Sequence, residues 1–187
     1  MSGRPVILFY VQHLRGIGHV FRATRIARQL AAAGARVHLA WGGSRIPSMD
    51  LQGLEVTWLE PVKVADDSYS LLVDMQGGAV DEATRERRKT ALLALFADAR
   101  PDIVVTEAYP FGRRQMRFEL EPLMQAARAA PWRPLTVSSI RDIMQENRAE
   151  KRVRESLDAV RDWFDLVLVH GDPNLLPIEA TLPQRST

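Results

Sequence analysis

The 187-residue sequence predicts an α/β protein with a Rossmann-like, doubly wound parallel sheet and helices on both faces. Short apolar runs alternate along the chain with longer stretches of helical periodicity, and residues typical of turns separate them. The runs carry Val, Ile and Leu at odd and even positions alike, as expected of parallel strands covered on both sides. A hydrophobic content of 46% is enough for one domain spanning residues 1–187.

The apolar runs predict six strands, each short and followed by turn residues. They cover residues 5–11, 36–41, 54–59, 102–106, 135–139 and 165–169.

Four segments have helical periodicity: residues 18–33, 81–99, 112–130 and 147–164. Gly34 is expected to end the first helix, and Pro122 predicts a kink or break in the third. In the first helix, the sheet face is expected to hold Ala23, Ile26, Ala27 and Leu30, and the solvated face Arg22, Arg25 and Arg28.

The connection formed by residues 60–80 is longer than a compact sheet requires, and connections of this length are often functional. Its polar side chains could line a pocket, although a solvated loop with a Gly77-Gly78 turn is an equally good interpretation. The polar residues concerned are Asp66, Asp67, Tyr69 and Asp74.

Composition narrows the class of protein further. The net charge is only +2, and the arginines of residues 22–28 and 85–88 alternate with apolar or acidic residues, so we expect no nucleic-acid binding. The chain has no cysteine, which fits a reducing compartment. No apolar stretch approaches the roughly 20 residues of a membrane span. We therefore expect a cytoplasmic protein with no integral membrane segment.

Polar residues follow four of the expected strands, at the edge where ligands bind in open parallel sheets. They are expected to converge there, although for any one of them a capping or loop role is the alternative. In chain order they are Gln12, His13, Gly16, Gly18 and His19; Glu107 and Tyr109; Ser138, Ser139, Arg141 and Asp142; and His170, Gly171 and Asp172. The candidates for substrate binding among them are His13, Gly16, Gly18, Ser139, Arg141, Asp142, His170 and Asp172.

Three familiar motifs are not satisfied. Gly16 and Gly18 follow a strand, but Phe21 occupies the third glycine position of a dinucleotide fingerprint, and the second strand ends in WGG, without the acid that would hold a ribose. The sequence has neither a GxxxxGK phosphate loop nor the GxSxG turn of a serine hydrolase. No set of residues has metal-ligand spacing. We expect no nicotinamide or flavin cofactor and no bound metal.

His19 is expected in the first turn of a helix, reached through a glycine-permitted tight turn after the first strand. The positive end of a helix disfavours an imidazolium, so this position favours a neutral imidazole that can accept a hydroxyl proton. In the equally supported alternative, His19 bonds only the turn backbone, and the glycines admit a phosphate to the helix amides.

An ordered set of motifs resembles the N-terminal half of predicted bacterial glycosyltransferases of the GT-B type, related to the peptidoglycan N-acetylglucosaminyl transferase. Nearly the whole chain takes part in the resemblance. The motifs are FYVQHLRGIGHVFRATRIARQLAAAG, WGG, DDSYSLLVD, TEAYPFGRRQMRFELEPL, SSIRDI and VLVHGDPNLLPIEAT.

The resemblance implies metal-independent transfer of a hexose or N-acetylhexosamine from a nucleotide sugar to an acceptor hydroxyl. The nucleotide sugar would be a co-substrate, and no resident cofactor is implied. In related enzymes a histidine at the first strand-helix turn often removes the acceptor proton, and His19 matches that position. Glu107 could orient the imidazole or bind an acceptor hydroxyl, or it could simply cap the next helix. Arg141 and Asp142 could meet donor or acceptor, or pair with each other.

The resemblance also implies a donor-binding domain beginning soon after Asp172, whereas the sequence ends at Thr187. We expect this acceptor-side domain to be inactive alone, and a second polypeptide could supply the donor domain. The competing hypothesis is a non-catalytic module that binds a saccharide, a nucleotide or a partner domain in the same crevice. An NAD-linked oxidoreductase would need the missing third glycine and acid.

Overall fold

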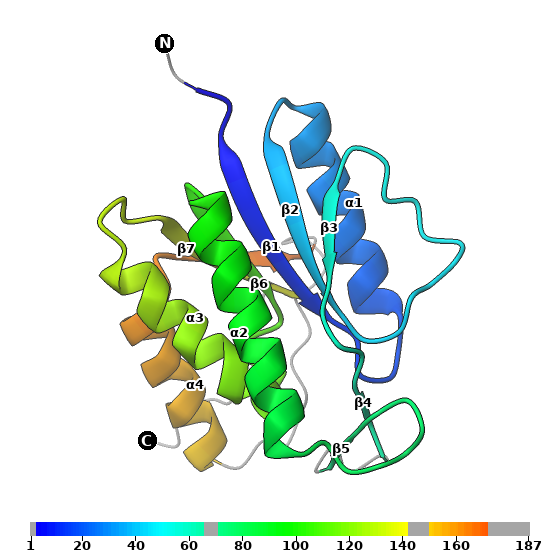
Figure 1. Ribbon diagram of the computed structural model, residues 1–187. Helices are drawn as coiled ribbons and strands as arrows, with labels where there is room; N and C mark the ends of the chain where they lie inside the picture. The colour runs from blue at the N-terminus through cyan, green and yellow to red at the C-terminus, as the bar shows by residue number, and fades with distance from the viewer. Residues whose placement is uncertain (1–2, 66–70, 142–149, 172–187) are drawn as a thin grey trace.

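The computed structural model describes residues 3–65, 71–141 and 150–171, and it confirms the α/β class (Figure 1). A six-stranded sheet has the order β3-β2-β1-β6-β7-β8, and every neighbouring pair is parallel. All six predicted strands are present within two residues of the expected ends. Their bounds are β1 Val6–Gln12, β2 Arg36–Gly42, β3 Glu55–Trp58, β6 Ile103–Glu107, β7 Leu135–Arg141 and β8 Leu166–His170.

Helices cover both faces of the sheet, as expected for strands that are apolar on both sides. One core cluster joins Phe9 and Val11 to Ala23 of the first helix, and the other joins Leu8 and Tyr10 to Leu92 and several residues of the later helices. Figure 1 shows α2, α3 and α4 side by side on the face opposite α1. The bounds are α1 Gly18–Ala32, α2 Glu82–Ala99, α3 Arg117–Ala129 and α4 Glu150–Trp163.

The helix α1 follows the predicted pattern except at one arginine. Ala23 and Ala27 are buried against the sheet, and Gly34, with φ of 102°, ends the helix in the left-handed conformation that glycine adopts without strain. The expectation that Arg22 is solvated is wrong, because its guanidinium pairs with the buried carboxylate of Glu107. Helical periodicity assigns Arg22 to the solvated face of α1. Its long side chain nevertheless reaches Glu107, because a buried carboxylate needs a cationic partner.

The expected break at Pro122 does not occur, because α3 continues through this residue as one helix. Pro122 is the sixth residue of α3, so the ring removes a single backbone donor near the amino-terminal end. Leu120, Leu123 and Met124 are buried on either side of it, and their packing holds the helix against the sheet. The amino-terminal part of the predicted helix, at residues 114–116, is a 3₁₀ turn.

The long connection at residues 60–80 contains a short antiparallel hairpin that the sequence did not predict, formed by β4 (Lys63–Val64) and β5 (Leu72–Val73). Asp74 accepts hydrogen bonds from the backbone N–H groups of Gln76 and Gly78 at 2.9 and 2.8 Å. Asp74 therefore stabilises its own turn, which agrees with the solvated loop and not with the polar pocket among the two alternatives. The other polar candidates of this segment, Asp66, Asp67 and Tyr69, lie outside the described residues.

Residues 147–149 of the fourth predicted helix also lie outside the described residues. Within the three described ranges, no helix combines the length and the apolar character needed to cross a bilayer.

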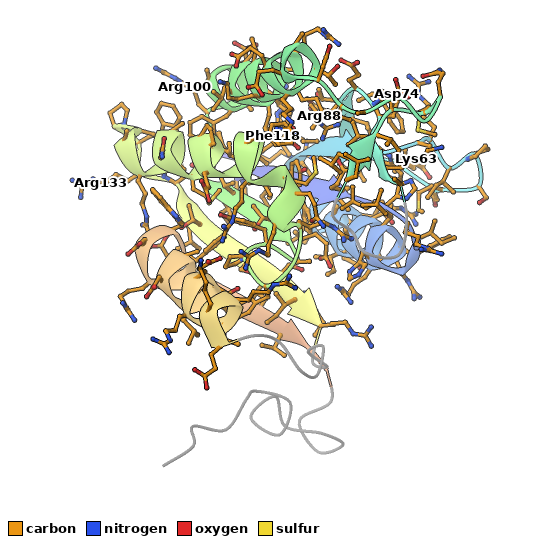
Figure 2. All side chains as sticks on the ribbon, turned by 90° about the horizontal axis from the view of Figure 1, so that it is seen from below. Lys63, Asp74, Arg88, Arg100, Phe118 and Arg133 are labelled. Carbon is orange, nitrogen blue, oxygen red and sulfur yellow. The ribbon has the colours of Figure 1, made fainter. Side chains whose placement is uncertain are left out.

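A buried ion pair fastens α2 and α3 to the end of β1. Arg88 donates to the Glu119 carboxylate from Nε and Nη2 at 2.9 and 2.7 Å, to Gln12 Oε1 at 2.8 Å and to the carbonyl oxygen of Glu60. The Tyr10 hydroxyl donates to the same carboxylate at 2.5 Å. Burial and the Glu119 charge hold the pKa of Tyr10 well above its ordinary value. Figure 2 shows Arg88 enclosed by the fold, whereas Lys63 and Asp74 lie at its periphery.

We expect Arg88→Met to lower the free energy of unfolding by roughly 3–5 kcal/mol, because it leaves a buried carboxylate without its cation. Urea denaturation followed by circular dichroism measures the change. The matched control is Arg87→Met, which removes a neighbouring arginine whose ion pair with Glu60 is exposed, and it should cost much less. Equal losses in the two variants would contradict a special role for the buried pair.

Candidate functional site

The register of the sheet places two polar side chains next to each other at the carboxyl edge. Glu107 ends β6 and is paired in register with Ser139 of β7. Side chains alternate between the faces of a strand, so Glu107 shares a face with Val105, and Ser139 shares it with Val137. Both valines belong to the core cluster under α1. The carboxylate and the hydroxyl therefore lie on the α1 side of the sheet, just beyond its apolar core.

The first turns of α1 bring a histidine and an arginine to the same carboxylate. The turn after β1 is short, so α1 begins at Gly18 and its second residue, His19, stands beside the end of β6. His19 Nδ1 lies 3.2 Å from Glu107 Oε1, and Arg22, one helical turn later, donates to the same oxygen. Arg22 Nη2 is also 3.3 Å from His19 Nδ1. The side chains of His19 and Arg22 are 31% and 24% exposed, whereas Glu107 is fully buried.

Glu107 is ionised despite its burial. Burial alone would raise the pKa of its carboxyl group, but hydrogen bonds from His19, Ser139 and Arg22, together with the Arg22 charge, outweigh it and lower the pKa below the ordinary value. Because an anionic carboxylate only accepts, the 3.2 Å contact is a hydrogen bond when His19 Nδ1 carries the proton, and in that tautomer Nε2 has a free lone pair. Such an imidazole can accept a proton at Nε2.

The end of β8 supplies a second imidazole. Ser139 Oγ lies 2.9 Å from Glu107 Oε2 and 2.9 Å from His170 Nε2. The pKa of His170 is lowered, first by burial and then by the Arg22 charge, against an opposing effect of Glu107. Ser139 is almost completely buried and its hydroxyl is engaged within the protein, so the structure places it beneath the edge and not on a surface open to substrate.

Gly16, in the turn before α1, and Gly18, the first residue of α1, are exposed, but neither has the conformation that only glycine adopts easily. A Cβ atom at either position would meet no heavy atom within 4 Å. The short turn expected from the sequence is present, but its backbone does not depend on glycine, and the space above it is open. The neighbouring side chains Ile17 and Phe21 are 46% and 40% exposed.

The two glycines at the end of β2, Gly42 and Gly43, are required for a steric reason. A Cβ atom on Gly42 would lie 1.8 Å from the side-chain oxygen of Gln12, and one on Gly43 would lie 2.5 Å from the His13 carbonyl oxygen. Gly43 also has φ of 93°. The WGG motif thus allows the chain after β2 to pass close to the turn after β1, and it fixes where that turn lies.

His13 is apart from the Glu107 cluster and bonds elsewhere. Its Nε2 atom is 3.2 Å from the Ser44 carbonyl oxygen and 3.3 Å from the Ser44 hydroxyl, while Nδ1 is buried and makes no hydrogen bond. A cavity of about 430 Å³ adjoins His13, and its lining includes Arg15, Ser44, Lys63 and Met75 but neither His19 nor Glu107. The expected convergence is therefore real for some of the predicted residues and does not include His13.

Three other predicted site residues take no described part in the cluster. Arg141 ends β7, is exposed, and is paired in register with His170. Asp142 and Asp172 lie outside the described residues, so their predicted contacts are not placed. Among the residues that the structure describes, no three His, Asp or Glu side chains gather in a way that could hold a metal ion.

Arg22 is the cluster residue that sequence reasoning missed. A signal was present, because Arg22 follows His19 by three residues, and residues at this spacing lie on the same side of a helix. Once His19 was assigned to the edge of the sheet, Arg22 could have been assigned with it. The acid at the end of β6 would then have given the arginine a partner.

No protein-family model matches the sequence, and no curated protein matches it. Several solved structures share the fold. SsfS6, a glycosyltransferase of Streptomyces sp. SF2575, matches with a TM-score of 0.54 and 16% identity over 94% of this chain and 53% of its own. UGT2 of Phytolacca americana, solved with UDP-2-fluoro-glucose and pterostilbene, matches with a TM-score of 0.55 and 14% identity over 97% of this chain and 51% of its own. SnogD, a glycosyltransferase of Streptomyces nogalater, matches with a TM-score of 0.53 and 19% identity over 97% of this chain and 50% of its own.

The chain spans about half the length of the solved structures it matches. At these identities the similarity establishes a shared fold. The fold predicted from the sequence is thereby confirmed, whereas the closer relation to the peptidoglycan N-acetylglucosaminyl transferase stays a prediction.

The lowered pKa of Glu107 predicts a specific dependence of stability on pH. A carboxylate with a lowered folded pKa stabilises the protein fully above its unfolded value, near 4.5, and this contribution is lost as the pH falls through the folded value. The difference in unfolding free energy between wild type and Glu107→Gln should therefore be largest at neutral pH and shrink in acid below about pH 4.5. Chemical denaturation at a series of pH values measures it.

The control is Glu55→Gln, which removes a carboxylate whose pKa is also lowered, chiefly by a hydrogen bond from Arg36, but which is half exposed. Its effect should have the same sign and a smaller size, because solvent screens it. A pH-independent difference for Glu107→Gln would show that the carboxylate is not held ionised as described.

Proposed function

We propose that this chain is the acceptor-side half of a GT-B glycosyltransferase, and that His19 is its general base. The observation that carries the proposal is the His19–Glu107 pair at the carboxyl edge of the sheet, between a buried carboxylate and an imidazole that is 31% exposed. This edge is where open parallel sheets bind ligands, and β1 and β6 flank the point where the strand order reverses. The likeness to solved glycosyltransferases supports the same assignment at the level of fold.

In the proposed reaction, His19 Nε2 accepts the proton of an acceptor hydroxyl while Nδ1–H remains bonded to Glu107. The hydroxyl oxygen forms a bond to the anomeric carbon of a hexose or N-acetylhexosamine. The bond from that carbon to the phosphate oxygen of the nucleotide breaks, and the nucleotide leaves with the electron pair. Glu107 stabilises the imidazolium that forms, as the buried carboxylate of a catalytic triad does. The transfer as proposed is metal-independent and uses the nucleotide sugar as a co-substrate, without a resident cofactor.

The donor-binding half is proposed to lie outside the 187 residues, either later in the same polypeptide or in a separate chain. Support comes from the neighbouring structures, each about twice as long as this chain. The exposed apolar side chains of Ile17 and Phe21 lie on either side of His19 in the sequence, where a second domain would have to approach. The chain alone is therefore expected to lack normal transferase activity, and a cytoplasmic location is part of the same proposal.

A second candidate function is a non-catalytic module that binds a small molecule or a partner. The observation favouring it is the cavity of about 430 Å³ beside His13, which is large enough for a small ligand and excludes both His19 and Glu107. Calorimetry on the chain alone distinguishes the two candidates. Binding of acceptor-type hydroxyl compounds supports the acceptor-side half, whereas binding of nucleotide sugars without any acceptor binding would contradict it.

His19→Ala should lower kcat by about 100-fold or more in an enzyme completed with a donor-binding half, since loss of a general base typically has an effect of this size. Release of the nucleotide from the donor measures the rate. The matched control is His38→Ala, because His38 Nδ1 lies 3.3 Å from Glu55 in a second histidine–glutamate pair elsewhere on the sheet. A completed enzyme that keeps full activity with His19→Ala would rule out the proposed base.

A further inference from the structure

The two oxygens of the Glu107 carboxylate face different parts of the molecule. Oε1 receives the α1 side chains, His19 and Arg22, and Oε2 receives the Ser139 hydroxyl. Ser139 in turn contacts His170 Nε2 at 2.9 Å. One buried hydroxyl thus connects the carboxylate behind His19 to a second imidazole on the next strand.

A hydroxyl has a single proton, and this fixes the possible arrangements around Ser139. Donation to a carboxylate is about twice as strong as donation to a neutral acceptor, so the proton should point to Glu107 Oε2. Ser139 Oγ must then accept from His170, which requires a proton on His170 Nε2. In the opposite tautomer, with the proton on Nδ1, His170 Nε2 would compete with Glu107 for the hydroxyl proton.

The charges around His170 are compatible with a neutral imidazole that donates through Nε2. Burial is the largest effect that lowers the pKa of His170, the Arg22 charge of α1 lowers it further, and the Glu107 charge of β6 opposes both. Arg141 of β7 is the register partner of His170, but its side chain is exposed and it is not among the charges that shift the pKa of His170. A neutral His170 can still donate one hydrogen bond, and Ser139 is the partner within reach.

We propose that His170 and Ser139 are positioning residues for the His19–Glu107 pair. His170 in its Nε2–H tautomer donates to Ser139, Ser139 donates to Glu107 Oε2, and the carboxylate is thereby held with Oε1 toward His19 Nδ1. The catalytic consequence rests on the proposed function of His19 as a base, whereas the arrangement of protons is a property of this chain. These residues therefore act through Glu107 and have no contact of their own with a substrate in the proposal.

The experiment is nuclear magnetic resonance of the imidazole nitrogens in the full 187-residue chain, which contains only four histidines. Single His→Gln variants assign the signals. At pH 7.5, the expected result is a neutral His170 protonated on Nε2 and a His19 that carries a proton on Nδ1. A His170 protonated on Nδ1 in the unaltered chain would overturn the proposal.

Ser139→Ala tests the connection between the two imidazoles. It should change the nitrogen shifts of both His19 and His170, because the carboxylate loses its Oε2 donor. The matched control is Ser138→Ala, which removes a buried hydroxyl from the adjacent residue of β7, where Oγ donates to the Tyr109 carbonyl oxygen at 2.6 Å. His19 shifts that are identical in Ser139→Ala and wild type would overturn the proposal.

In an enzyme completed with a donor-binding half, His170→Leu should lower kcat by about 10-fold or more and leave KM unchanged, since small displacements of a base are costly. His170→Gln, which keeps a donor in a similar place, should restore most of the rate. The expected tautomers together with responsive His19 shifts support the positioning role even where no sugar transfer is found. In that case the transferase function alone fails.

Discussion

A buried negative charge organises the carboxyl edge of this sheet. Glu107 is fully enclosed at the end of β6, and an isolated carboxylate in such a place would be neutral or strongly destabilising. It is ionised because α1 and β7 each bring donors to it. The short turn after β1, the position of α1 and the register of β7 on β6 all have to be correct for these donors to arrive. The cluster around Glu107 therefore exists because these donors compensate its buried charge.

A second buried carboxylate, that of Glu119, shows how the same chemistry serves a different purpose. Glu119 and its partner Arg88 are both fully buried, and Tyr10 completes the set. Two partners of Glu107, His19 and Arg22, are instead partly exposed. The closed pair holds helices to the sheet, whereas the open one leaves an imidazole and a guanidinium within reach of a ligand. Access to solvent separates a structural ion pair from a candidate reactive one.

The two sides of the turn after β1 also have different characters. On one side Gly42 and Gly43 let the chain after β2 approach His13 closely, and a cavity lies beside that histidine. On the other side His19 enters the Glu107 cluster, with exposed apolar residues next to it. The same turn thus makes a close structural contact at His13 and presents His19 at the open edge of the sheet.

The sequence by itself determined the fold class and the six sheet strands, and it placed the four helices approximately. Those predictions depend on local periodicity and on the burial of apolar runs, which any single strand or helix carries in its own residues. The position of His19 at a helix start was predicted for the same reason. The loop role of Asp74 was one of two alternatives, and hydrogen bonds within its own turn decided between them.

Only the tertiary structure decided which polar residues meet. Arg22 belongs to a helix face that periodicity assigns to solvent, and it turns inward because a charge 85 residues away requires it. Ser139 and His170 reach Glu107 through strand register, and His13 leaves the cluster because it bonds Ser44. Pro122 sits in an unbroken helix because the packing around it outweighs one lost hydrogen bond. In each case the decisive energy lies in a contact between residues distant in sequence, and no local pattern encodes such a contact.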